Sequence, residues 1–213
     1  MTRAKICGLS TPEAVSAAVE GGAGWLGFVF FPASPRAVTV EQARLLAEAA
    51  RGRTGVVAVT VDADDALLTG IGLRLRPDWV QLHGAEAPAR AAEVRRLTGA
   101  KVVKALPVST AADVEAAAGW AGAADALMFD ARPPAGGALP GGVGARFDWS
   151  LLQGRAPQGL WFLAGGLDPA SVAEAVRVTG APAVDVSSGV ESAPGVKDPA
   201  RIRAFLDALK DPT

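Results

Sequence analysis

Short, continuously apolar runs alternate along this chain with longer stretches of helical character that are rich in Ala, Leu, Glu and Arg. Residues 25–30 (Trp-Leu-Gly-Phe-Val-Phe) contain no polar side chain, which is typical of a strand that is covered on both faces. The helical stretches carry start signals, as at Thr11-Pro12-Glu13, which offers an N-cap, a proline at the first helical position and an acid in the first turn. The alternation predicts repeated βα units around a parallel sheet.

Eight such units follow one another. The predicted strands are residues 4–7, 25–30, 55–61, 79–84, 101–108, 126–130, 159–166 and 183–186. The predicted helices are residues 11–20, 40–50, 62–70, 88–98, 109–118, a short one from 147, 168–179 and 198–209, with Asp168 and Asp198 as caps. Eight regular units without a linker predict one closed (β/α)8 TIM barrel, a single domain over residues 1–213. An open doubly wound sheet is the alternative, but no dinucleotide-binding fingerprint follows the first strand.

Composition narrows the functional classes. The chain has 213 residues, a formal net charge of −1, one cysteine and one histidine. A lone Cys7 cannot form an intramolecular disulfide, and a lone His83 has no partner for a His-based site, so we expect no metal. Basic residues are interspersed with acidic ones and form no basic stripe, so we expect no nucleic-acid partner. No apolar run approaches the roughly 18 residues of a membrane helix, and the N-terminus has no secretory h-region, so a cytoplasmic location is expected.

The barrel prediction turns strand ends into candidate site residues. In (β/α)8 barrels catalytic groups come from the carboxyl ends of the strands and the loops after them. The residues at these positions are Cys7, Arg36, His83, Asp130, Gly165, Gly166, Ser187, Ser188 and Gly189. Glycines after the seventh strand and Ser-Ser-Gly after the eighth occupy the barrel positions where backbone N–H groups commonly collect a phosphate. The alternative is that Gly165 and Gly166 only end a strand.

Each of the other candidates has a functional and a structural interpretation. Cys7 is a candidate base, or a small buried hydrophobe. Asp130 lies at the mouth of an apolar barrel, where desolvation keeps a carboxyl available as a proton donor; otherwise it caps the loop backbone. Arg36, between stiffening prolines, suits a bidentate grip on a carboxylate, or is a solvated loop cation. For His83 we expect a structural role, with its ring bonded to a backbone carbonyl. A thiol, a carboxyl and a phosphate site together suggest proton transfer on a phosphorylated sugar.

Six segments, taken together, resemble one family over nearly the whole chain. They are Lys5-Ile6-Cys7-Gly8, Phe31-Pro32-Ala33-Ser34-Pro35-Arg36, Val80-Gln81-Leu82-His83-Gly84, Gly141-Gly142-Val143-Gly144 with Phe147-Asp148-Trp149, Leu163-Ala164-Gly165-Gly166-Leu167, and Asp185-Val186-Ser187-Ser188-Gly189-Val190-Glu191 with Lys197-Asp198. In kind and order they are similar to those of phosphoribosylanthranilate isomerase.

The resemblance implies an Amadori rearrangement in tryptophan biosynthesis, with no cofactor and no metal. It implies that Cys7 is the general base and Asp130 the general acid, that Arg36 holds the anthranilate carboxylate, and that the loops after strands seven and eight bind the phosphate. Two positions depart from the family pattern: Val143 replaces a threonine in the long loop, and Ala131 replaces a serine after Asp130. These departures concern details of the loop.

The expected chemistry requires the pKa values of Cys7 and Asp130 to be tuned in opposite directions, because the thiol must lose its proton readily while the carboxyl keeps one.

The partner we expect is a small phosphorylated substrate, and the sequence leaves open a monomer or a homodimer. Two other functions stay open. One is the sugar isomerase of histidine biosynthesis, which uses a carboxylate where Cys7 stands. The other is a catalytically silent barrel that only binds a phosphorylated ligand.

Overall fold

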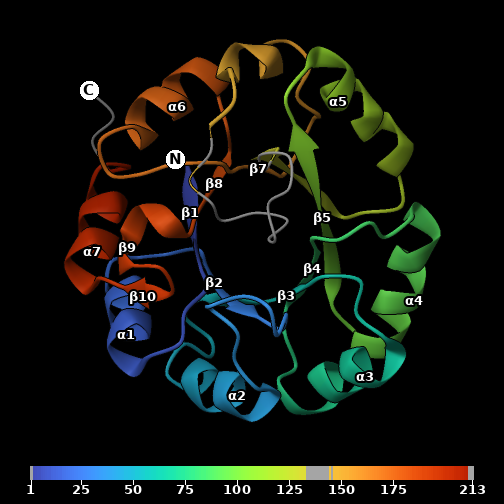
Figure 1. The fold of residues 1–213 in the computed structure, drawn as a ribbon, viewed down its shortest axis with the longest axis vertical. Helices are drawn as coiled ribbons and strands as arrows, with labels where there is room; N and C mark the ends of the chain where they lie inside the picture. Colours follow the sequence, from blue (N-terminus) through green and yellow to red (C-terminus); the bar gives the residue numbers. More distant parts are fainter. Residues whose placement is uncertain (1, 133–143, 145, 211–213) are drawn as a thin grey trace.

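Eight parallel strands close into one barrel in sequence order in the computed structural model, which describes residues 2–132, 144 and 146–210 (Figure 1). The strands are β1 (Arg3–Cys7), β2 (Trp25–Val29), β3 (Gly55–Thr60), β4 (Trp79–Leu82), β5 (Lys101–Val108), β6 (Ala126–Ala131), β7 (Trp161–Leu163) and β8 (Ala183–Val186). The α-helices in the described part are α1 (Pro12–Glu20), α2 (Val40–Glu48), α3 (Asp65–Arg74), α4 (Pro88–Thr98), α5 (Ala111–Glu115), α6 (Val172–Thr179) and α7 (Pro199–Asp207). The predicted fold class is confirmed.

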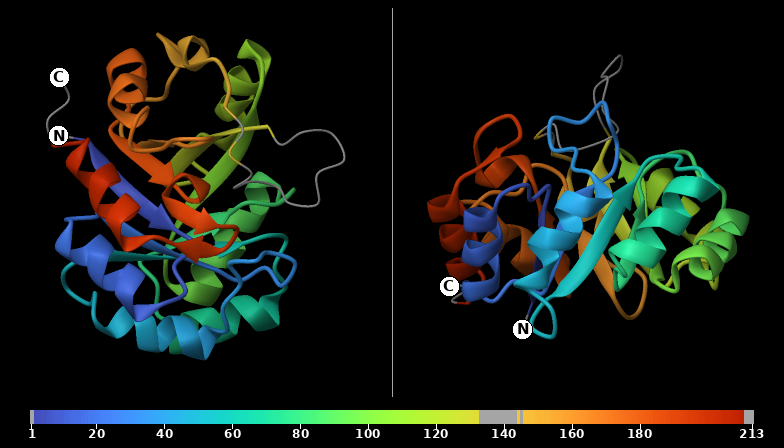
Figure 2. Two further views of the ribbon diagram at one scale, coloured as in Figure 1. Left: turned by 60° about the vertical axis from the view of Figure 1, so that its left-hand side comes forward. Right: turned by 90° about the horizontal axis from the view of Figure 1, so that it is seen from below.

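Closure of the barrel brings the two ends of the chain together. Strand β1 pairs with β2 on one side and with β8 on the other, where Lys5 lies opposite Asp185. Both edges of every strand are therefore covered, and the helices surround the barrel (Figure 2). No helix of the described residues is long and apolar enough to cross a membrane.

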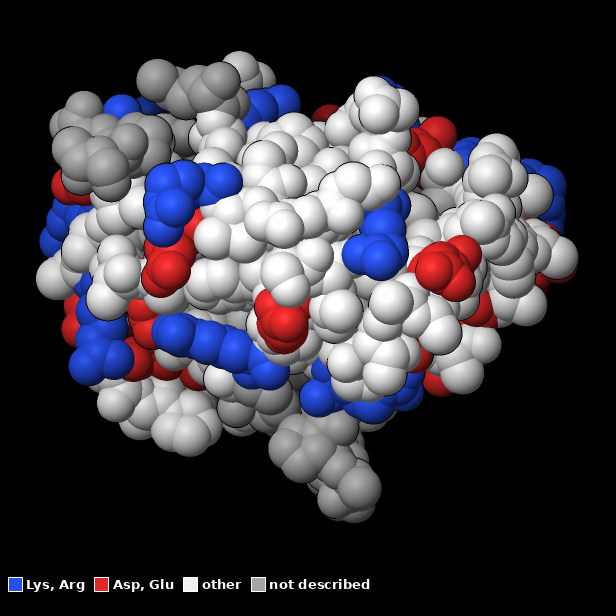
Figure 3. All heavy atoms as spheres, turned by 90° about the horizontal axis from the view of Figure 1, so that it is seen from above, with Lys and Arg blue, Asp and Glu red and all other residues white. Residues whose placement is uncertain are grey.

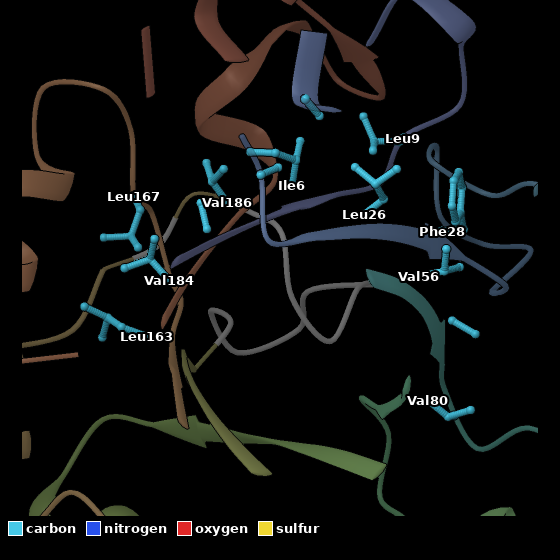
Figure 4. Packing of buried hydrophobic residues seen from close by; sticks show 14 of the residues in the cluster. Ile6, Leu9, Leu26, Phe28, Val56, Val80, Leu163, Leu167, Val184 and Val186 are labelled. Atoms are coloured by element: carbon cyan, nitrogen blue, oxygen red, sulfur yellow. The ribbon is translucent and has the colours of Figure 1, made fainter. Parts of the chain in front are cut away.

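Alternation along the strands divides the side chains between two cores. Apolar residues such as Ile6, Leu26, Phe28 and Val184 point outward and pack against the helices (Figure 4). The intervening positions point into the barrel, where a second cluster includes Cys7, Trp25, Val57, Val103, Met128 and Phe162. Because successive side chains of a strand point to opposite faces, Lys5 and Cys7 share the interior face of β1.

Most predicted boundaries hold, and the exceptions have local causes. Strand β7 ends at Leu163, earlier than predicted, and the left-handed backbone of Gly165 (φ 90°) and Gly166 (φ 61°) follows soon after it. Helix α6 begins at Val172 because the Asp168 carboxylate accepts hydrogen bonds from the Ala170 and Ser171 N–H groups and closes a separate turn before the helix. Asp168 was therefore wrongly predicted to cap the helix itself.

Three helical regions also differ from the prediction. Helix α5 is short and continues as a 3-10 helix at Ala116–Trp120, and among the described residues β6 is followed only by a 3-10 helix at Trp149–Leu152. Helix α3 starts and ends later than predicted. The Gly141-Gly142-Val143 part of the long-loop motif lies outside the described residues.

A small hairpin after β8 was not predicted. Strands β9 (Glu191–Ala193) and β10 (Val196–Lys197) are antiparallel and follow a 3-10 turn at Ser188–Val190. A Cβ atom on Gly195, in the turn of this hairpin, would lie only 2.6 Å from the Pro35 carbonyl oxygen. The hairpin is thereby packed against the loop that carries Arg36. Elsewhere on the surface, basic and acidic side chains lie near one another on the face drawn in Figure 3.

Candidate active site

Cys7 ends β1 inside the barrel, at the carboxyl end of the strands. Its side chain is buried, beside a buried ion pair in which Lys5 Nζ lies 2.7 Å from Asp185 Oδ1. Burial raises the pKa of the Cys7 thiol; the charge of Lys5 lowers it, and the charge of Asp185 raises it again. The net shift is upward, so the thiol is protonated at neutral pH. The expectation of a readily ionised thiol is therefore wrong for the protein without its ligand, because desolvation outweighs the cations.

Arg36 lies directly above the turn that follows Cys7. Gly8 has a left-handed backbone (φ 77°), and a Cβ atom there would come within 2.6 Å of Arg36 Cδ. Glycine is therefore needed both for the positive φ and for the close approach of the Arg36 side chain. The Arg36 side chain is buried and holds Glu191 through two bonds, Nε to Oε1 at 2.7 Å and the terminal nitrogen to Oε2 at 2.9 Å. The solvated-cation interpretation is therefore wrong, and Arg36 is a fixed guanidinium within the barrel mouth.

Lys197 extends this network to the loop after β8. Its ammonium bonds Glu191 Oε1, the Ser187 carbonyl oxygen at 3.0 Å and Ser187 Oγ at 3.2 Å. The Ser187 hydroxyl in turn donates to the Cys7 carbonyl oxygen at 3.3 Å. Burial raises the pKa of the Glu191 carboxyl, but the bonds and charges of Arg36 and Lys197 lower it by more, so it is an anion at neutral pH.

Asp130 lies near the end of β6, across the barrel mouth. Its Oδ1 atom accepts the Ala131 N–H at 2.9 Å, which is the loop-capping role, and its Oδ2 atom lies 3.3 Å from His83 Nε2. The other ring nitrogen of His83, Nδ1, is 2.7 Å from Gln81 Nε2. His83 therefore contacts two side chains rather than the backbone carbonyl that we expected, and it joins the candidate acid to a fully buried glutamine.

The orientation of the Gln81 amide decides where the His83 proton resides. With the amide nitrogen assigned toward Nδ1, that atom accepts, and the neutral ring carries its proton on Nε2, facing the Asp130 carboxylate. The Gln81 Oε1 atom is then buried without a partner among the described residues. Rotation of the amide would place Oε1 against an Nδ1–H group and leave Nε2 as an acceptor for a protonated Asp130. The three side chains can thus accommodate both protonation states of the acid.

The loop after β7 packs against both of its neighbours, the end of β6 and the loop after β8. A Cβ atom on Gly165 would meet the Ala131 nitrogen at 2.7 Å, and one on Gly189 would meet the Leu167 carbonyl oxygen at 1.9 Å. Only glycine permits these approaches. Arg146 fixes the same loop, since its Nε donates to the Gly166 carbonyl oxygen at 2.8 Å and its terminal nitrogen bonds Asp168.

The structure therefore brings all nine candidates to the carboxyl end of one barrel, but it adds residues for which the sequence suggested no role. These are Lys5, Gln81, Arg146, Asp185, Glu191 and Lys197. One signal could have found three of them: Lys5, Gln81 and Asp185 are polar residues two positions before a candidate, within strands that are otherwise apolar. They share the candidate's face of the strand. Glu191 and Lys197 lie in a hairpin, where no such periodicity exists.

The fold and the cluster at its carboxyl end are those of a (β/α)8-barrel enzyme. The family described as "PRAI: N-(5'phosphoribosyl)anthranilate (PRA) isomerase" matches residues 4–208. The chain belongs to this family.

Individual relatives agree with this assignment. The N-(5'-phosphoribosyl)anthranilate isomerase of Caulobacter sp. (strain K31) is 58% identical over 99% of both chains. The crystal structure of phosphoribosyl anthranilate isomerase from Thermotoga maritima has a TM-score of 0.87 and 34% identity, with 99% of each chain covered. A crystal structure of the isomerase in complex with reduced 1-(o-carboxyphenylamino)-1-deoxyribulose 5-phosphate has a TM-score of 0.84 and 32% identity, again with 99% of each chain covered.

Proposed function

We propose that this enzyme catalyses the Amadori rearrangement of N-(5-phospho-β-D-ribosyl)anthranilate to 1-(2-carboxyphenylamino)-1-deoxy-D-ribulose 5-phosphate, in L-tryptophan biosynthesis. The observation that carries the proposal is the placement of Cys7 and Asp130 at the carboxyl ends of β1 and β6 of one barrel, in a chain 58% identical to an isomerase of this name. A thiol and a carboxyl facing one mouth supply the base and the acid that an aldose-to-ketose conversion needs.

The reaction divides into two proton transfers. Asp130 donates a proton to the furanose ring oxygen as the bond from that oxygen to C1 breaks, and the nitrogen lone pair forms a C1=N iminium. The Cys7 thiolate then takes the proton from C2. The electrons of that C–H bond form a C1=C2 double bond, and the iminium electrons return to nitrogen. The resulting enolamine tautomerises to the ketone. Because the iminium acidifies the C2 proton, a modest base is sufficient.

The remaining candidates bind the two anionic ends of the substrate. Arg36 contacts the anthranilate carboxylate, with Glu191 holding the guanidinium in place. The phosphate is bound by Gly165 and Gly166 together with Ser187, Ser188 and Gly189, and His83 contacts the substrate beside Asp130. The ligand named in the related complex carries both a carboxylate and a phosphate, which supports this division. The reaction needs no cofactor or metal, and the expected compartment is the cytoplasm.

Loss of phosphoribosylanthranilate fluorescence tests the proposal with purified protein. The wild type is expected to turn the substrate over, and Cys7→Ser to lower kcat by about 100-fold or more, the usual scale for a lost base. Serine preserves the size of the side chain, so the thermal midpoint should change little. Isomerisation of the histidine-pathway precursor with phosphoribosylanthranilate left untouched would overturn the proposal. Binding without turnover of either compound would instead establish a silent barrel.

A further inference from the structure

Lys5 is a buried cation that has no role in the two proton transfers of the proposed reaction. Its side chain is 1% exposed, inside the barrel, two positions before Cys7 on the same face of β1. The apolar side chains in the same cluster as Cys7 include Trp25 and Phe162. Removing an ammonium from water costs several kcal/mol, and a hydrophobic residue is often as stable in such a position. The presence of a lysine there therefore calls for a functional explanation.

The contacts of Lys5 place its ammonium between an acid and the thiol. Asp185, directly opposite in the β1–β8 pairing, accepts a hydrogen bond at 2.7 Å. The charge of the same ammonium acts on the Cys7 thiol, two positions further along the same face of β1. On the neighbouring strand, a Cβ atom on Gly27 would lie 3.0 Å from Lys5 Nζ and 3.1 Å from Cys7 Cα. The backbone of β2 thus leaves space for the ammonium beside the thiol.

We propose that Lys5 is a positioning residue for the isomerisation, whose ammonium, held by Asp185, is the counter-ion of the Cys7 thiolate during proton abstraction from C2. This inference rests on the proposed function, because it takes Cys7 to be the base.

The proton balance gives Lys5 an electrostatic role only. The thiol first loses its proton to solvent, and the thiolate then takes the C2 proton and becomes a neutral thiol again. Lys5 keeps all three of its protons throughout. Burial lowers the pKa of Lys5, but Asp185 and Cys7 raise it by more, so the ammonium stays charged over the working pH range. Its attraction therefore acts on the charged form of Cys7 and leaves the neutral thiol nearly unaffected.

Three charged groups act on the thiol from the elements packed around it. Lys5 on β1 and Lys197 on β10 favour the thiolate, whereas Asp185 on β8 disfavours it. Lys5 is the strongest of the three, since its charge acts on the thiol more strongly than the charge of Asp185 or of Lys197. Two variants of one ion pair should therefore shift the thiol in opposite directions. A purely structural ion pair would show no such opposition, because either variant would simply destabilise the fold.

An ultraviolet titration of the thiolate measures this directly in the full chain. The protein has one cysteine and no tyrosine, so the alkaline absorbance change of a thiolate reports on Cys7 without tyrosinate interference. We expect Lys5→Met to raise the pKa of Cys7 and Asp185→Asn to lower it. A rise of one unit corresponds to a roughly tenfold loss of thiolate at pH 7, so kcat of Lys5→Met should fall about tenfold or more and recover as the pH is raised.

Two further variants keep the test decisive. Lys5→Met leaves the Asp185 carboxylate buried without its partner, so the double variant Lys5→Met/Asp185→Asn is titrated as well; its thiol pKa should still exceed that of the wild type. Lys104→Met is the matched control, since Lys104 is another buried strand lysine that pairs with a buried glutamate, Glu86, at 2.8 Å. Its thiol titration should coincide with that of the wild type.

The outcomes separate this inference from the proposed function. An unchanged thiol pKa in the double variant, or a shift in the same direction for Lys5→Met and Asp185→Asn, would overturn the role of Lys5. The titration contains no substrate, so it is independent of the reaction. Failure of the proposed function would appear instead as wild-type protein that leaves phosphoribosylanthranilate untouched, and full turnover by Cys7→Ser would remove Cys7 as the base.

Discussion

The two sides of the barrel mouth are built from different kinds of interaction. Around Cys7, strands β1 and β8, the loop after β2 and the β9–β10 hairpin contribute five buried charged residues, namely Lys5, Asp185, Arg36, Glu191 and Lys197. Around Asp130, the partners are the imidazole of His83, directly after β4, and behind it the amide of Gln81 on β4. One side is a network of ion pairs, and the other is a chain of hydrogen bonds.

This difference shows how one barrel mouth can serve two opposite proton transfers. A base is assisted by cations that favour its charged form, whereas an acid is assisted by groups that can either donate to its carboxylate or accept from its protonated form. The cations near Cys7 are themselves paired with carboxylates, which prevents the uncompensated burial of charge in the free enzyme. Without a ligand the thiol pKa is still raised, so we expect kcat/KM to keep rising with pH beyond the ordinary thiol range.

The largest effect is expected from breaking the acid side at its carboxyl group. Asp130→Asn retains an acceptor for the Ala131 N–H group but removes the transferable proton, so kcat should fall by about 100-fold or more. Steady-state kinetics and a thermal melt measure the two properties separately.

Asp125→Asn is the matched control for this prediction. Asp125 precedes the same strand at its opposite end, where its carboxylate accepts the Val102 N–H at 2.7 Å and an Arg95 N–H at 3.0 Å. That end of a barrel serves stability, so this variant should melt earlier and keep its kcat. A wild-type kcat in Asp130→Asn would remove Asp130 from the mechanism.

A smaller effect is expected from breaking the charged side at Arg36. Charge-assisted bonds of this kind contribute about 1.5–3 kcal/mol, so Arg36→Ala should raise KM by roughly 10- to 100-fold, with a smaller change in kcat. Arg44→Ala, which removes an arginine that pairs with Glu41 on the surface of α2, is the control and should leave KM unchanged. If KM of Arg36→Ala equals that of the wild type, Arg36 serves only the Glu191 ion pair.

The smallest effect is expected at Gln81, which pairs with His83 on the uncharged side of the barrel mouth. Leucine at this position removes a buried oxygen that has no partner among the described residues, so the melting temperature should stay level or rise. The same change removes the amide that pairs with His83 Nδ1 in either tautomer and holds the ring beside Asp130, and kcat should fall by about threefold to tenfold. A lower melting temperature with kcat intact would instead make Gln81 a purely structural residue.

The strand periodicity explains why the sequence was a good guide to one part of the site. Parallel strands of a barrel end at a common rim, so Cys7 and Asp130 could be placed there from the apolar runs that precede them. The phosphate loops followed from their place after strands seven and eight, whereas the anthranilate carboxylate as the partner of Arg36 came from the family resemblance. The partners could not be placed in this way. Lys5 and Asp185 are 180 positions apart in the sequence, and their contact depends on the closure of β1 against β8.

The sequence by itself determined the eight βα units, the closed barrel, the family and the end of the barrel that carries the candidate site, because these follow from local alternation, helix caps and short motifs. Only the tertiary structure decided the state of the groups within that site. Burial raised the pKa of Cys7, the unpredicted hairpin supplied Glu191 to Arg36, and Gln81 and His83 were aligned with Asp130. Desolvation and long-range pairing depend on which strands become neighbours, and that information exists only in the folded chain.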